Sequence, residues 1–147
     1  MSWTRFLDKG DVKPHETSKQ ELDDMRGLII RDLQDAALPG LSSDRRFATA
    51  YNAALQAACM AVACSGYRVS ARAGHHKITF EAAALAVGGE MHELADYFDT
   101  CRRKRNVIDY MNSSVATNTE SEELLEKAEK LRQTVEVWIA ERHESLL

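Results

Sequence analysis

The sequence has few of the residues that break regular structure. Only two prolines and seven glycines occur in 147 residues, which argues against a turn-rich all-β fold and against disorder. Hydrophobic residues make up 44% and charged residues 29% of the chain, as in globular domains of this length, which bury roughly 70% of their unfolded surface. We therefore predict one compact domain that is mostly helical.

The sequence also lacks an apolar run near its start and an excess of positive charge. No segment near the N-terminus has the length and apolar character of a signal peptide or a membrane span, so we expect a cytoplasmic protein with no membrane partner. The net charge is −4 and the pI is near 5.7. Because the Debye length is about 8 Å at physiological salt, only a local basic patch could bind a polyanion.

Cysteine is scarce and its number is odd. Cys59 and Cys64 lie in an alanine-rich run, where cysteine behaves as a small hydrophobic residue, and Cys101 stands apart from them. Free thiols are the expected state, and a disulfide or a metal site is the alternative. The chain shows no ligand spacing typical of a zinc site, so we predict no metal and no other cofactor.

Apolar side chains recur at three and four residues over several segments, which predicts an all-α protein, an antiparallel bundle of four to five helices. A helix from residue 43 to about 65 is apolar nearly all round and should lie at the centre of the bundle. The other predicted helices begin at Ser18, which has capping-box spacing to Glu21, at Thr79, at Glu90 after the break at Gly88-Gly89, and at Glu120.

Residues 1–16 form a separate N-terminal arm in this prediction, ahead of a bundle domain at residues 17–147. The arm carries two large aromatic residues, Trp3 and Phe6, and ends near Pro14. Aromatic side chains gain much from burial, so we expect the arm to pack on the bundle or on a second subunit. A disordered tail is the alternative.

A cluster of basic residues stands near the end of the fourth predicted helix. Spacings of three, four and seven residues place Arg102, Arg105 and Asp109 on one face, with Arg103, Asn106 and Tyr110 on the adjoining face. The cluster has three interpretations: a structural one, with an ion pair between Arg105 and Asp109; an anion-binding surface; and a surface that docks another protein.

Several short segments of the sequence together resemble a known family. They are Arg45-Arg46-Phe47-Ala48, Ala50-Tyr51-Asn52-Ala53-Ala54, Gly66-Tyr67-Arg68, Gly74-His75-His76, and Arg105-Asn106 before Tyr110. With these segments the chain resembles the HEPN superfamily, and most of all its small actinobacterial-type members. The resemblance covers roughly residues 17–145 and implies a bundle of four or five helices, commonly a homodimer. It also implies a relation to metal-independent ribonucleases and to toxins paired with a minimal nucleotidyltransferase antitoxin.

The signature of active HEPN ribonucleases is only partly present. Arg105-Asn106 matches its start, but Tyr110 stands where histidine is expected, and no histidine occurs between Arg102 and Ala140. Aligning on the tyrosine instead needs a two-residue deletion, which would rotate the following residues by about 200° on a helix. The loop histidines His75 and His76 could supply an imidazole in the same or a partner subunit; local hydrogen bonding is their alternative role.

The resemblance and the basic cluster together predict a protein that binds RNA or nucleotide and could act as a toxin-like ribonuclease. A catalytically silent module that docks a partner protein or a second copy is the alternative. The expected partners are a second copy, RNA, and a nucleotidyltransferase-type antitoxin that would modify Tyr110. The candidate catalytic residues are Arg105, Asn106, Asp109 and Tyr110, and the candidate RNA- or phosphate-binding residues are Arg102, Arg103, Lys104, His75 and His76.

Overall fold

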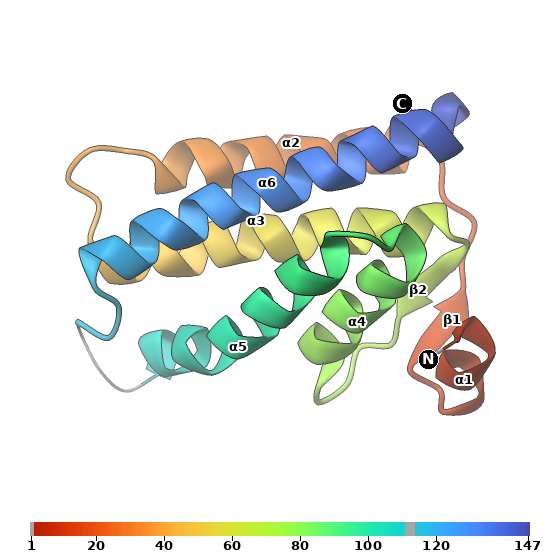
Figure 1. The fold of residues 1–147 in the computed structure, drawn as a ribbon, viewed down its shortest axis with the longest axis horizontal. Coiled ribbons are helices and arrows are strands. Elements are labelled where there is room, and N and C mark those ends of the chain that lie inside the picture. Colours follow the sequence, from red (N-terminus) through yellow and green to blue (C-terminus); the bar gives the residue numbers. More distant parts are fainter. Residues whose placement is uncertain (1, 111–113) are drawn as a thin grey trace.

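The computed structural model describes residues 2–110 and 114–147, with the side chains of Asp109 and Tyr110 left out. It is an all-α bundle with one small sheet, which confirms the predicted fold class (Figure 1). The elements are α1 (Trp3–Asp8), β1 (Val12–Pro14), α2 (Lys19–Ala36), α3 (Ser43–Cys64), β2 (Tyr67–Val69), α4 (His75–Val87), α5 (Met91–Tyr110), α6 (Asn118–Arg142) and a short 3-10 helix, η1 (Glu144–Leu146).

Helix α3 lies at the centre of the bundle, as its composition predicts. It packs against α2, α4, α5 and α6, and Figure 1 shows α2 and α6 on one side of it and α4 with α5 on the other. Alanines along α3, among them Ala50, Ala54 and Ala58, are fully buried. Small side chains let neighbouring helices approach closely, and this explains why one helix can have four partners.

Most of the helix starts that were predicted from capping residues are confirmed. The Ser18 hydroxyl accepts a hydrogen bond from the backbone N–H of Glu21, 3.1 Å away, at the start of α2. Helix α6 begins two residues before the predicted Glu120, because Thr117 and Glu120 form a reciprocal capping box. Gly88 and Gly89 separate α4 from α5, as predicted.

The predicted start of the third helix, at Thr79, is wrong. Helix α4 begins at His75, after Gly74, which adopts a left-handed conformation with φ of 82° and makes no side-chain cap. The Thr79 hydroxyl donates to the His75 carbonyl, 2.7 Å away, inside the helix. His75 and His76 therefore lie in the first turn of α4 rather than in a loop.

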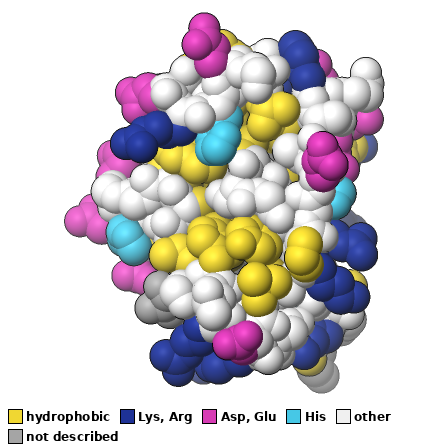
Figure 2. All heavy atoms as spheres, turned by 90° about the vertical axis from the view of Figure 1, so that its right-hand side faces the viewer, with side chains coloured by type: hydrophobic (Ala, Val, Ile, Leu, Met, Phe, Trp, Pro, Cys, Tyr) yellow, Lys and Arg dark blue, Asp and Glu magenta, His cyan; other side chains and the backbone are white. Residues whose placement is uncertain are grey.

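The N-terminal arm packs on the bundle, so the disordered-tail alternative is wrong. Phe6 is buried at 3% exposure in a second apolar cluster with Val62 of α3, and the Trp3 ring stacks on Tyr67, with centroids 4.5 Å apart. Strand β1 pairs antiparallel with β2, a two-stranded sheet that the sequence analysis missed. Figure 2, which faces this end of the molecule, shows hydrophobic side chains gathered near its middle.

Within the described part of the chain, α3 is long and apolar enough to cross a membrane by length and composition alone. Two thirds of its most apolar window is buried by the other helices, as in the core helix of a bundle.

The three cysteines are free, which confirms the predicted thiols. Burial raises the pKa of Cys59 and of Cys64 to about 11, which makes both thiols poor nucleophiles.

Candidate anion-binding site

An aromatic cluster fixes α4 and α5 against the central helix. Tyr51 of α3 is fully buried, and its ring contacts Phe80 of α4 and Phe98 of α5 at centroid distances of 5.8 and 6.2 Å. Phe80 and Phe98 stack on each other at 5.6 Å. Because these rings bind the three helices together, the first turn of α4 lies beside the last turns of α5.

These two helix ends enclose a hollow of about 190 Å³, which we call the anion hollow. Arg105 lies next to it, where its Nη2 donates to Oδ1 of Asn52, 3.2 Å away. The Arg105 guanidinium carbon also lies 5.9 Å from the centroid of the Tyr51 ring. The lining residues are Ala73, Gly74, His75, His76, Arg102 and Asn106.

The charge of the anion hollow comes from Arg102 and Arg105, which lie near the partly buried imidazole of His76. Burial, together with the neighbouring His75, Arg105 and Arg102, lowers the pKa of His76 to about 4. His76 is therefore neutral at pH 7. Arg102 contributes a permanent positive charge, and its Nε donates to the Asp99 carboxylate, 3.1 Å away.

Two of the candidate basic residues lie away from the anion hollow. Lys104 projects from another side of α5 and forms an ion pair with Glu120 of α6. There it lines a separate hollow of about 220 Å³, together with Tyr97 and Glu123. Arg103 is exposed to solvent and does not line the anion hollow. Helical geometry explains the division, because residues two apart on a helix point about 200° apart.

The predicted roles of Asp109 and Tyr110 concern side chains outside the described residues. The ion pair between Arg105 and Asp109 and the modification of Tyr110 therefore stay predictions.

The sequence analysis assigned no role to Tyr51 or Asn52. In the structure Tyr51 contacts His76, and Asn52 accepts a hydrogen bond from Arg105. The signal available for them was a phenol and an amide side by side in an alanine-rich stretch of helix.

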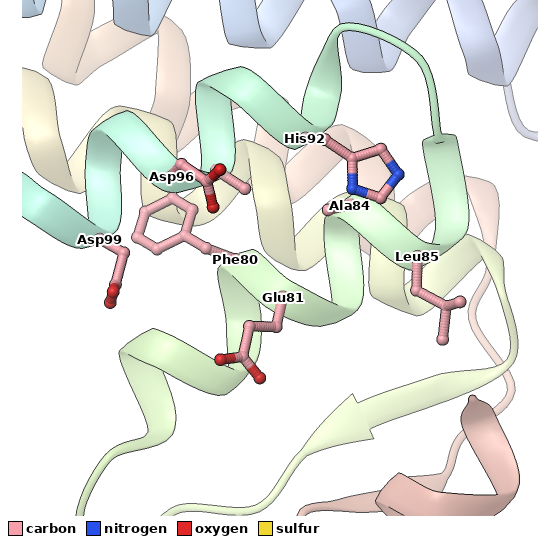
Figure 3. A pocket seen from close by; sticks show the side chains of 8 residues that line it. Phe80, Glu81, Ala84, Leu85, His92, Asp96 and Asp99 are labelled. Atoms are coloured by element: carbon pink, nitrogen blue, oxygen red, sulfur yellow. The ribbon is translucent and has the colours of Figure 1, made fainter. Parts of the chain in front are cut away.

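A second hollow lies further along the contact between α4 and α5, and we call it the acidic groove (Figure 3). Its volume is about 240 Å³. Figure 3 shows the Phe80 ring between the two helices, with Asp96 and Asp99 extending from α5 and Glu81 from α4. The groove is lined by Phe80, Glu81, Ala84, Leu85, His92, Ala95, Asp96 and Asp99. No cluster of His, Cys, Asp and Glu suited to a metal ion occurs among the described residues.

The fold and the site define an all-α domain with a cationic hollow between two of its helices. A comparison with family models identifies the family. The family model described as SAV_6107-like HEPN matches residues 40–136. This segment is more than half of the chain and includes every residue that lines the anion hollow. The chain therefore belongs to the SAV_6107-like HEPN family, a module related to RNA or nucleotides or to protein interaction. No curated protein and no solved structure matches it.

Proposed function

We propose that the protein binds RNA by holding a phosphate group in the anion hollow. The observation that carries the proposal is that the first turn of α4 and the last turns of α5 line the same hollow. This arrangement brings His75 and His76 beside Arg102 and Asn106. Two histidines of the neighbouring helix thus lie beside the start of the α5 signature, which itself contains no histidine.

The chemistry of the lining residues suits a phosphodiester. The Arg102 guanidinium can donate two parallel hydrogen bonds to phosphate oxygens, and charge-assisted bonds of this kind are roughly twice as strong as neutral ones. Asn106 is exposed at the hollow and has an amide to orient the ligand. Arg105 adds positive potential from its half-buried position beside Tyr51. The net charge of −4 predicts that binding is local and sensitive to salt.

Two matched variants test this site. Arg102 and Lys104 each carry one positive charge on α5 and each forms one ion pair with a carboxylate, but only Arg102 lines the anion hollow. We expect Arg102→Gln to weaken binding of a labelled single-stranded RNA about tenfold, because one charge-assisted phosphate contact is lost. Lys104→Gln should change the affinity less than twofold.

Fluorescence anisotropy at fixed salt measures both affinities, and thermal unfolding of each variant controls for folding. Equal losses in the two variants would show that any RNA binding depends on net charge alone. No binding by the parent protein would favour the alternative, a silent interaction module. In that case the functional feature of the fold would be a docking surface rather than the hollow.

Ribonuclease activity is a further part of this proposal. Cleavage at the 2′-hydroxyl needs a base for its proton and cations for the phosphorane charge. His75 could meet the first need, and Arg102 with Arg105 the second. Incubation of RNA with the parent and with Arg105→Ala tests it, because cleavage by the parent that the substitution abolishes supports a toxin-like enzyme.

The partners expected from the resemblance are also proposals. A homodimer is tested by the mass of the protein in size-exclusion chromatography with light scattering, where a mass of one chain would contradict it. A nucleotidyltransferase-type antitoxin is tested by mass spectrometry of Tyr110 after the two proteins are produced together. An unmodified Tyr110 would count against that partner.

A further inference from the structure

His75 and His76 are neighbours with different hydrogen-bond partners. Their rings meet edge to face, with centroids 4.4 Å apart. Nδ1 of His75 lies 2.8 Å from the carbonyl oxygen of Arg72, whereas Nδ1 of His76 lies 3.3 Å from the hydroxyl of Tyr51. In a neutral imidazole one nitrogen donates and the other accepts, and the partner of one nitrogen decides the role of the other.

The partner of His75 fixes its tautomer directly. A carbonyl oxygen can only accept a hydrogen bond, so Nδ1 of His75 must carry the proton that is donated to Arg72. The neutral ring then has no proton on Nε2. Since His75 is exposed and lines the anion hollow, its Nε2 is available as a hydrogen-bond acceptor.

The partner of His76 is a phenol, which could donate or accept. Tyr51 is fully buried, and burial raises the pKa of its hydroxyl, so the proton stays on oxygen. A buried O–H group needs an acceptor, because an unsatisfied one loses the hydrogen bond that it makes to water in the unfolded chain. Of the charged groups near the phenol, the guanidinium groups of Arg102 and Arg105 can only donate, and the Asp99 carboxylate is held in an ion pair with Arg102. The structure places Nδ1 of His76 at this hydroxyl, so the phenol donates to it, and the proton of His76 lies on Nε2.

We infer that His75 and His76 are held in opposite tautomers, so that the anion hollow offers an acceptor nitrogen on His75 beside a donor N–H on His76. Tyr51 is the positioning residue for His76. The choice of ligand rests on the proposed function: an acceptor beside a donor suits a ligand in which a hydroxyl is adjacent to a phosphate. RNA has that arrangement at every 2′-hydroxyl, whereas DNA lacks the hydroxyl. The hollow should therefore prefer RNA to DNA of the same sequence.

The tautomers themselves are tested by nitrogen NMR of the two imidazoles in the parent protein at neutral pH. We expect Nδ1 to be protonated in His75 and Nε2 to be protonated in His76. Tyr51→Phe should mix the tautomers of His76 and leave those of His75 unchanged. Tyr97→Phe is the matched control, since that phenol bonds to Cys101 and Glu123 elsewhere on α5 and α6. A parent His76 protonated on Nδ1, or a Tyr51→Phe spectrum identical to the parent's, would overturn the inference.

The preference for RNA is tested with His75→Asn. The asparagine amide keeps a donor near the Arg72 carbonyl but removes the acceptor nitrogen. We expect the parent to bind RNA about fivefold more tightly than DNA, the effect of roughly one hydrogen bond, and the variant to bind both equally. An unchanged preference in the variant would refute the role of His75. If the NMR result holds but neither nucleic acid binds, the proposed function fails and the tautomers stand.

Discussion

The anion hollow and the acidic groove lie at two ends of the same contact between α4 and α5, yet they carry opposite charge. The groove presents Glu81, Asp96 and Asp99 around an apolar floor, whereas the hollow presents Arg102 with two histidines. Asp99 and Arg102 form an ion pair at the border. One helical turn of α5 thus separates a surface that repels a polyanion from one that attracts it. Net charge says little about binding when opposite charges are segregated in this way.

Reversing the charge of the hollow should have the largest effect. Arg102→Glu makes the hollow resemble the groove, and we expect it to weaken RNA binding about 100-fold, the effect of about 2.8 kcal/mol. Lys104→Glu introduces the same charge change on the opposite side of α5 and should have a much smaller effect. Anisotropy titrations of both variants measure the difference. Similar losses would contradict a site confined to the hollow.

The partly buried imidazole of His76 should make the fold sensitive to acid. The pKa of His76 is about 4 in the folded protein and about 6.5 in the unfolded chain. Between these values the unfolded chain binds a proton that the folded protein does not, so the free energy of unfolding falls as the pH drops from about 6.5 to 4.

His76→Asn removes this titration and keeps an acceptor for the Tyr51 hydroxyl. We expect the variant to lose less stability than the parent between pH 6.5 and 4, measured by urea unfolding. Asn106→Ala, in the same hollow but without a titrating group, should follow the parent. An identical pH dependence of the parent and His76→Asn would show that His76 protonates freely in the folded state.

Neutralising the groove should have the smallest effect. The double variant Glu81→Gln with Asp96→Asn removes two negative charges that do not touch the hollow. We expect RNA affinity to rise about twofold at low salt and not at all at high salt, because mobile ions screen charges at this range. A rise that persists at high salt would mean that RNA extends into the groove.

Local signals in the sequence predicted much of the bundle. Ser18 marked the start of α2, the alanine-rich composition marked α3 as the core, and the glycine pair marked the break before α5. The start of α4 was missed because Gly74 begins it through backbone conformation, without a capping side chain. The strands were missed because each has only three residues, too few for an alternating pattern.

The candidate site depended on packing that the sequence does not reveal. Helical spacing gathered the basic residues of α5, but it could not show that Lys104 pairs with Glu120 on another helix. Likewise, the approach of His76 to Arg105 results from the stacking of Phe80 on Phe98, which joins residues from different helices. The partial signature at Arg105-Asn106 becomes a candidate site only because folding brings residues of α3 and α4 next to it.

The central claim is that the first turn of α4 and the last turns of α5 form one RNA-binding surface. Backbone NMR of the parent protein, titrated with a short single-stranded RNA, tests it most directly. We predict that the amide signals of Gly74, His75, His76 and Asn106 shift together, while those of Glu81 and His92 in the acidic groove do not. Shifts confined to Tyr97, Glu120 and Glu123 on the other side of α5, or no shifts at all, would contradict the account.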